Sequence, residues 1–440
     1  MKSKITISLL MCLFFVAVSA QEIDYETYEL QNGLDVILHQ DNSAPVITVG
    51  VMYHVGAKDE APGRTGFAHF FEHLLFEGTE NIERGEWFNI VSANGGSNNA
   101  NTTQDRTYYY ETFPSNNLEL GLWMESERML HPVINQIGVD TQNEVVKEEK
   151  RSRIDNAPYG KFIYATGINK HIFFKHPYKN SVIGSMKDLD AAKLDEFKDF
   201  FSKYYGPNNA TLVVAGDLDI DNTKKMIEDY FGPVPRGPEV ERINIKEDPM
   251  TEEVKVTEYD SNIQLPLKVF VYRTPSMKAK DAYVLNMISE VLSGGKTSRL
   301  YKRMVDGDKI ALNVLAFPRS QEDYGTYSIG AIPLGETSME TIETVIDEEI
   351  EKLKTELISE REYEKLQNTF ENRFVSSNSS IQGVANSLAR YHVLYGDVSL
   401  INNEIEIYRN ITREDIQEVA QKYLKKNNRL NMDYLPENEK

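Results

Sequence analysis

The sequence predicts an α+β protein built from two similar domains, each a mostly antiparallel sheet with helices packed on one face. Three observations support this prediction. Strand-like stretches joined by tight turns are followed by amphipathic helices, the segment 196–212 recurs at 415–431, and a stretch rich in proline and glycine at 232–248 lies between the two copies.

Residues 1–20 are typical of a secretory signal peptide. Lys2 and Lys4 precede an apolar run over 5–18, and Val-Ser-Ala at 18–20 supplies small residues for cleavage before Gln21. The run is short for a membrane span, and no later stretch holds 18 uninterrupted apolar residues. We therefore expect an exported protein, periplasmic or secreted, without membrane contact after cleavage; the alternative is an uncleaved anchor.

The composition excludes several classes of protein. The only cysteine, Cys12, lies in the predicted signal, so the mature chain would have neither disulfides nor thiolate chemistry, and cysteine proteases and Cys-ligated zinc are excluded. The net charge of −20 argues against a nucleic-acid partner, because phosphate binding needs clustered lysine and arginine.

The first half alternates between strand and helix patterns. Stretches rich in β-branched and aromatic residues predict strands, and longer stretches with helical periodicity predict helices. The predicted strands cover 27–40, around an Asn-Gly turn, 44–56 and 102–113, and the predicted helices cover 66–79, 118–132 and 141–155.

The internal repeat places the domain boundary. EFKDFFSKYYGPNNATL and DIQEVAQKYLKKNNRLN each read as a helix, a turn and a closing strand, and they match without gaps in a Lys-Tyr pair and an Asn-Asn pair. Each copy ends its half of the chain, and the breaks in periodicity between them predict a linker. The predicted division is a signal peptide at 1–20, a catalytic domain at 21–235, a linker at 236–250 and a domain of similar fold at 251–440.

The stretch GFAHFFEHLLFEGT, residues 66–79, holds the most informative pattern. At about 100° per residue, Glu72 and His73 fall within about 60° of His69 on one helical face. The apolar side chains gather on the opposite side; they are Phe67, Phe70, Phe71, Leu74 and Leu75.

Two histidines one helical turn apart can both reach one zinc ion, and Glu72 between them is placed to accept a proton from a water molecule. This H-x-x-E-H order is the inverzincin signature. With 8 histidines among 440 residues the order is rare by chance, although two solvated histidines on a surface helix remain the alternative.

A catalytic zinc usually takes three protein ligands and leaves one position open. No other histidine lies in a comparable setting. The acidic helix at 141–155 offers Glu144, Glu148 and Glu149, and the residues alone do not select one of them.

A resemblance to a known family selects among them. GFAHFFEHLLFEGT, NANTTQDRTYYY, QNEVVKEEKRSRIDNAPYG, YGPNNATLVVAGD and LSGGKTSRLYKRM occur in the order of the insulinase and pitrilysin superfamily, and the chain resembles its compact two-domain members, which include mitochondrial processing peptidase and bacterial homologues. The resemblance implies Glu149 as the third ligand and Arg299 as a substrate contact. It also implies that Asn99 and Ala100 lie on an edge strand that pairs with the substrate backbone.

Two positions depart from the family pattern. Many relatives carry a glutamate where this chain has Gln142, so any support from that position must come from a neutral amide. Many also place a tyrosine where this chain has Leu312, so a paired clamp of Arg299 with tyrosine would be incomplete.

The sequence therefore predicts a secreted zinc endopeptidase with one zinc per chain and Glu72 as general base, acting on peptides or unfolded protein. The resemblance implies a clamshell of similar domains completed by a second chain, either in a homodimer or with a paralogous subunit. The rival hypothesis is a non-catalytic, peptide-binding partner subunit of a heterodimeric peptidase.

Overall fold

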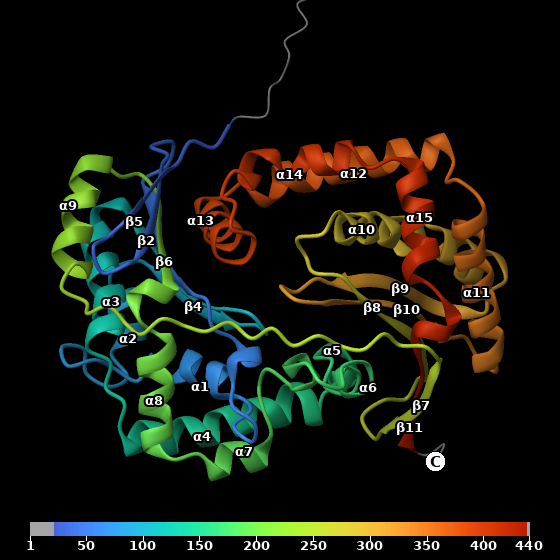
Figure 1. Cartoon of the computed structure of the whole chain (residues 1–440), viewed down its shortest axis with the longest axis horizontal. Helices are drawn as coiled ribbons and strands as arrows, with labels where there is room; N and C mark the ends of the chain where they lie inside the picture. Colours follow the sequence, from blue (N-terminus) through green and yellow to red (C-terminus); the bar gives the residue numbers. More distant parts are fainter. Residues whose placement is uncertain (1–21, 438–440) are drawn as a thin grey trace, which may run out of the picture.

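A β-sheet forms the centre of each half of the chain (Figure 1). The five strands of the second sheet are arranged, relative to chain order, like the last five strands of the six-stranded first sheet. The computed structural model describes residues 22–437, so the predicted signal peptide lies outside the described residues. The first sheet has the order β1-β2-β6-β3-β5-β4 and the second β7-β11-β8-β10-β9. Pairs β2/β6 and β7/β11 are parallel, and the other neighbours are antiparallel.

The strands of the first sheet are β1 (Glu26–Glu29), β2 (Asp35–Gln40), β3 (Val46–Tyr53), β4 (Ser97–Thr102), β5 (Thr107–Pro114) and β6 (Ala210–Gly216). Those of the second are β7 (Val254–Asp260), β8 (Leu267–Thr274), β9 (Ala311–Arg319), β10 (Gly325–Pro333) and β11 (Arg429–Pro436). Strand β6 begins at Ala210 and β11 begins 219 residues later at Arg429, which is the offset of the sequence repeat. The predicted α+β class with two similar halves is confirmed.

The helices of the first half are α1 (Phe67–Leu74), α2 (Trp87–Ala93), α3 (Leu118–Leu130), α4 (Gln136–Lys150), α5 (Gly160–Ile163), α6 (Asn169–Ile172), α7 (Met186–Ala191), α8 (Leu194–Tyr204) and α9 (Ile220–Phe231). Those of the second half are α10 (Lys280–Ser293), α11 (Met339–Thr355), α12 (Glu360–Ser377), α13 (Ile381–Arg390), α14 (Leu400–Arg409) and α15 (Arg413–Tyr423). Most of these helices enclose a separate apolar core on one face of the sheet of their own half, whereas α5, α6 and α13 contact the sheet of the opposite half.

The other face of each sheet is covered by a segment from the opposite half. Helix α13 places Val384 and Leu388 against β-sheet residues of the first half, among them Met52 and Val213. In return, residues 162–178 of the first half pack on the second sheet through side chains such as Phe173. This exchange buries apolar surface of both sheets between the halves, so the two halves share core rather than meeting only at a polar contact.

Residues 232–253, between α9 and β7, form neither helix nor strand and cross from the first half to the second (Figure 1). Among the helices that lie within residues 22–437, none is both long and apolar enough to cross a membrane.

Candidate metal centre and substrate cleft

Helix α1 is held in place at its first turn. Gly66 precedes it with φ of 97°, a left-handed conformation that favours glycine, and a Cβ there would lie 2.7 Å from the carbonyl oxygen of Ile183. The carboxylate of Glu60 accepts hydrogen bonds from the backbone N–H of Gly66 (2.8 Å) and Ala68 (3.0 Å), which satisfies donors that a helix start leaves free. The start of α1, and with it the position of His69, is therefore fixed by its neighbours.

The other side chains of α1 orient the helix. Phe67, Phe70, Phe71 and Leu74 are buried, and Phe67 stacks on Phe197 of α8 with ring centroids 4.5 Å apart. Because these residues occupy the side that faces the core, the three polar residues of the helix face α4 and the sheet edge. In the structure, the polar and apolar side chains of α1 lie on two different faces, as the sequence predicts, although His69 is itself buried.

Three donor atoms converge between α1 and α4. The Oε2 atom of Glu149 lies 3.0 Å from Nε2 of His73 and 3.5 Å from Nε2 of His69. The ligand atoms of these three residues all lie within 4.8 Å of one another, and no other group of three or more such side chains within residues 22–437 is arranged in this way. Two imidazole nitrogens and one carboxylate form a donor set that suits a catalytic zinc with one position left open.

The charges of this cluster also suit a metal ion. Burial, and then the neighbouring His73, lowers the pKa of His69 to about 4, so its imidazole is neutral at neutral pH. Burial opposes the charged form of Glu149, but the hydrogen bond from His73 and the nearby His69 hold the pKa of that carboxyl below its usual value. Metal ligands must be deprotonated, and the lowered pKa values of His69 and Glu149 favour that state in both side chains.

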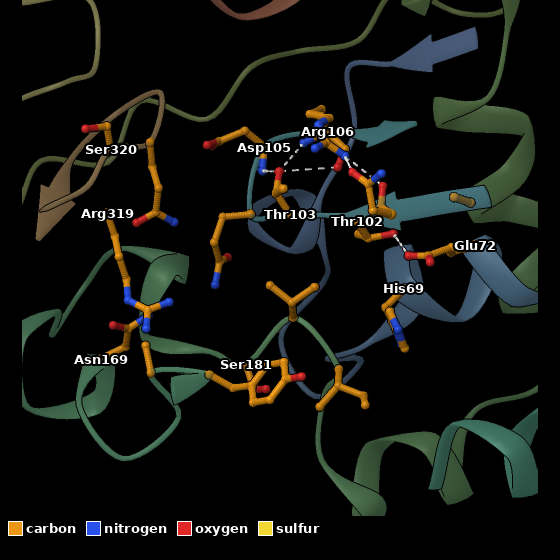
Figure 2. A pocket seen from close by; sticks show the side chains of 18 of the residues that line it. His69, Glu72, Thr102, Thr103, Asp105, Arg106, Asn169, Ser181, Arg319 and Ser320 are labelled. Atoms are coloured by element: carbon orange, nitrogen blue, oxygen red, sulfur yellow. Dashed lines mark hydrogen bonds between the residues drawn. The ribbon is translucent and has the colours of Figure 1, made fainter. Parts of the chain in front are cut away.

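Glu72 lies beside the cluster and points toward the first sheet. Its Oε2 accepts a hydrogen bond of 2.7 Å from the hydroxyl of Thr102 at the end of β4 (Figure 2). Burial raises the pKa of Glu72, an environment that makes a carboxylate a stronger base. Thr102 therefore fixes the orientation of Glu72, a role that the sequence analysis did not anticipate.

A cavity of about 500 Å³ adjoins these residues and is lined by both halves. His69, Glu72 and Glu149 form one side, and Met277, Arg319 and Arg390 come from the second half. Figure 2 shows Arg319 and Ser320 across the pocket from His69 and Glu72. The candidate centre thus opens into a space large enough to take part of a peptide.

The edge strand β4 borders this cavity. It pairs with β5 on one side and is the last strand of its sheet. Ala100 lines the cavity, whereas Asn99 is exposed and its amide oxygen accepts a hydrogen bond of 2.9 Å from the backbone N–H of Ala100. The structure therefore places both predicted substrate-binding positions on an edge strand; their contact with substrate stays a prediction.

Other predicted positions lie elsewhere. Arg299 is not among the residues that line the cavity, and its guanidinium binds both carboxylate oxygens of Glu362 at 2.7 and 3.0 Å. Leu312, on β9, is 46% exposed. Gln142 donates a hydrogen bond of 2.5 Å to Glu77 and so links α4 to the segment after α1. The structure does not bring Arg299 to the metal cluster, and a substrate contact there remains a prediction.

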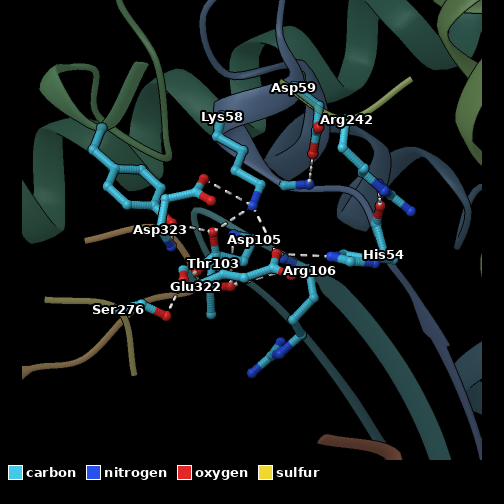
Figure 3. Close-up of polar contacts among 12 residues, drawn as sticks. His54, Lys58, Asp59, Thr103, Asp105, Arg106, Arg242, Ser276, Glu322 and Asp323 are labelled. Carbon is cyan, nitrogen blue, oxygen red and sulfur yellow. Dashed lines mark hydrogen bonds and ion pairs between the residues drawn. The ribbon is translucent and has the colours of Figure 1, made fainter. Parts of the chain in front are cut away.

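A buried ion cluster joins the halves next to the cavity (Figure 3). Lys58 lies 3.1 Å from Asp105 of the first half, and 2.7 Å from Glu322 and 3.2 Å from Asp323 of the loop between β9 and β10. His54 also contacts Glu322, at 2.8 Å. Because Gln321 of the same loop and Asp105 both line the cavity, this cluster fixes one of its walls.

Up to residue 437, where the described part of the chain ends, the second half has no counterpart of the candidate metal cluster. The residues 219 positions after His69, Glu72 and His73 are Ile288, Val291 and Leu292 on α10, and all three are buried in the core of the second half. The repeated fold therefore carries the candidate chemistry in one copy only.

Comparison with known proteins also distinguishes the first half of the chain from the second. Residues 35–184 match the family described as Insulinase (Peptidase family M16), and residues 191–370 match the Peptidase M16 inactive domain. The two matches together span most of the chain, so the protein belongs to peptidase family M16, the insulinase family. The resemblance seen in the sequence is confirmed.

Individual relatives extend along nearly the whole chain. A zinc protease named PqqE from Helicobacter pylori is 29% identical over 91% of this chain and 90% of its own length. A crystal structure of a protease from Helicobacter pylori superposes with a TM-score of 0.87 at 28% identity and covers 94% of this chain and 100% of that one. The periplasmic protease PqqL from Escherichia coli has the same fold at 18% identity, with a TM-score of 0.78, and 94% of this chain covers 48% of PqqL.

Proposed function

We propose that the protein is an exported zinc endopeptidase that hydrolyses peptides or unfolded protein segments, with one zinc held by His69, His73 and Glu149. The observation that supports this proposal most directly is the convergence of the three donor atoms within 4.8 Å of one another, beside Glu72 and at the edge of a cavity. Membership of a peptidase family and similarity to a named zinc protease agree with it.

Zinc bound by these ligands would make a nearby water molecule more acidic and would stabilise negative charge on the oxygen of the scissile peptide bond. Glu72 is the general base in this proposal. The hydroxyl of Thr102 occupies its Oε2, so Oε1 is left to take the proton from the attacking water. Glu72 then passes that proton to the nitrogen of the departing amine.

The edge of β4 would hold the substrate. An extended peptide can add to a free strand edge through main-chain hydrogen bonds, and such recognition requires an unfolded segment rather than a particular side chain. Asn99 and Ala100 would make these contacts, and Ala100 already lines the cavity. The bond to be cleaved would lie where this edge approaches Glu72, which Thr102 of the same strand contacts.

A second chain would complete the chamber around the substrate. This chain corresponds to 48% of the length of PqqL, so two chains of this size make up one molecule of that relative. A homodimer or a dimer with a paralogous subunit would satisfy this expectation. The predicted signal peptide and the periplasmic relative support export.

The test combines metal analysis with digestion of an unstructured peptide. The purified protein should contain about one zinc per chain, and a chelator should stop cleavage. Glu72→Gln should retain the zinc and lose cleavage, while the control Glu148→Gln, at an exposed residue of α4, should retain both. Full activity of Glu72→Gln would remove Glu72 as the base.

The same experiment separates the rival hypothesis. Peptide binding without turnover, with zinc present and with candidate partner chains added, would identify a non-catalytic binding subunit. Cleavage by the protein alone would refute that alternative.

A further inference from the structure

Guanidinium groups line the cavity near the candidate metal centre. Arg106 lies between β4 and β5, Arg319 ends β9, and Arg390 ends α13, so both halves contribute. Figure 2 places Arg106 beside Thr102 and Arg319 on the wall across from Glu72. None of the three is explained by the chemistry proposed for the metal ligands and Glu72.

Arg319 has unused hydrogen-bonding capacity. Its terminal Nη2 donates to the backbone carbonyl of Ile163, and its Nε is buried without an acceptor. A guanidinium has five N–H donors, so further acceptors are required. Burial lowers the pKa of Arg319, and no neighbouring carboxylate within the described residues offsets that effect.

Arg106 and Arg390 are also held without a close ion pair. Arg106 donates to the backbone oxygen of Asn101 at 2.8 Å and to the side-chain oxygen of the same residue, and burial lowers its pKa to about 10. The nearest carboxylate to Arg390 is Glu404, at 3.8 Å. At Arg319 and Arg106 the cavity therefore presents positive charge that the protein itself compensates only weakly. Burial also disfavours the charge of Arg390, but Tyr395, Tyr391 and Glu404 outweigh it and raise the pKa of that side chain.

The carboxylates that line the cavity are engaged elsewhere. Glu72 accepts from Thr102, and Glu149 contacts His73 and, at 2.6 Å, Arg153. Asp105 is 3.1 Å from Lys58 and also accepts from the hydroxyl of Tyr178. Positive charge removed from water is costly unless it is paired, and arginine binds carboxylates in a fixed, bidentate geometry.

We propose that Arg319, in the cavity that Arg106 and Arg390 also line, binds a carboxylate of the peptide substrate and so gives the enzyme a preference for acidic peptides. This inference rests on the proposed function and names its substrate class. The carboxylate is either an Asp or Glu side chain near the scissile bond or the C-terminal carboxylate of a short peptide. The net charge of −20 does not oppose it, because charges farther away than about 8 Å are largely screened at physiological ionic strength.

The test measures peptide binding to the full chain carrying Glu72→Gln, so that no cleavage interferes. Three fluorescent peptides of one sequence would be compared: one with an internal Glu and an amidated C-terminus, one with Gln at that position and an amidated C-terminus, and one with Gln and a free C-terminus. We expect one or both carboxylate-bearing peptides to bind at least about tenfold more tightly than the neutral one, the size expected for charge-assisted hydrogen bonds.

The source of the carboxylate follows from which peptide gains affinity. Adding Arg319→Gln should remove the gain, so that the three peptides bind with similar affinity, whereas Arg319→Lys should keep part of the gain. Arg361→Gln, at an exposed position on α12, is the matched control and should change nothing. Equal affinity for all three peptides, or no measurable binding of any of them, would overturn the inference.

The outcome for the proposed function is read separately, from cleavage by the unsubstituted protein. Cleavage without discrimination between the peptides would leave the endopeptidase standing and refute the carboxylate site. Tighter binding of the carboxylate-bearing peptides without cleavage would support the carboxylate site and refute the endopeptidase.

Discussion

Replacing Glu322 by glutamine should weaken the contact between the two halves in a pH-dependent way. Burial disfavours the charge of Glu322, but the hydrogen bond and charge of His54 and the charge of Lys58 outweigh it and lower its pKa from 4.5 to about 2. Only 13% of this side chain is exposed, so solvent screens the interactions little. The shift corresponds to about 3 kcal/mol of folding free energy.

The sign of the effect follows from the depressed pKa. The unfolded chain binds a proton at Glu322 more readily than the folded protein does, so the stabilisation is fully present above about pH 4.5 and is lost as the pH falls toward 2. Glu322→Gln should therefore cost about 3 kcal/mol at neutral pH, and the difference from the unsubstituted protein should shrink below pH 4.5.

Urea denaturation at a series of pH values between 7 and 3, followed by circular dichroism, would measure this difference. The control is Glu336→Gln, at an exposed turn residue, which should change the unfolding free energy by less than about 0.5 kcal/mol. A difference for Glu322→Gln that stays constant down to pH 3, or that is no larger than the control at pH 7, would show that the charge of Glu322 does not stabilise the fold.

Two further substitutions test how the site is positioned. Thr102→Val removes the hydrogen bond to Glu72 and should lower kcat by about 10- to 100-fold at unchanged zinc content, with recovery in Thr102→Ser; a kcat unaffected in the valine variant would show that Glu72 needs no such support. Gly66→Ala combines a positive φ with a Cβ 2.7 Å from a backbone oxygen, so it should destabilise the fold by about 1–3 kcal/mol and lower zinc occupancy. Gly63→Ala has a similar φ but no atom within 4 Å of the new Cβ, and thermal unfolding should separate the two; equal losses in both would argue against the close approach at α1.

Local patterns made α1 and the repeat predictable. The helical phase of residues 66–79 separates polar from apolar side chains, and a helix of that phase must turn its apolar face to the core. The repeat was predictable because the copies share residues at the junction of helix, turn and strand. Both features depend on residues close together in sequence.

The prediction of Glu149 as the third ligand depended on the resemblance, although the sequence held a signal for it. In α4, Val139 and Val146 are buried and mark the inner face of the helix. Glu149 lies three residues after Val146 on that face and is 16% exposed, whereas Glu144 and Glu148 are 68% and 70% exposed. The helical phase of α4 relative to its apolar residues therefore favours Glu149 over Glu144 and Glu148.

The cavity itself was not predictable from one sequence. Arg319 and Arg390 reach it from elements far along the chain, and α13 covers a sheet of the other half. These contacts arise because each half supplies a segment that covers the sheet of the other half. Local periodicity in the sequence does not indicate that exchange. Thr102, by contrast, was predictable from the sequence, because strand alternation places it on the same face of β4 as Ala100.

We propose above that His69, His73 and Glu149 hold one zinc ion. Elemental analysis of the purified protein after dialysis against a weak chelator tests it most directly. We expect about one zinc per chain in the unsubstituted protein and in Glu148→Gln, and strongly reduced zinc in Glu149→Gln. Zinc retained in full by Glu149→Gln, or absent from the unsubstituted protein after zinc has been supplied, would contradict it.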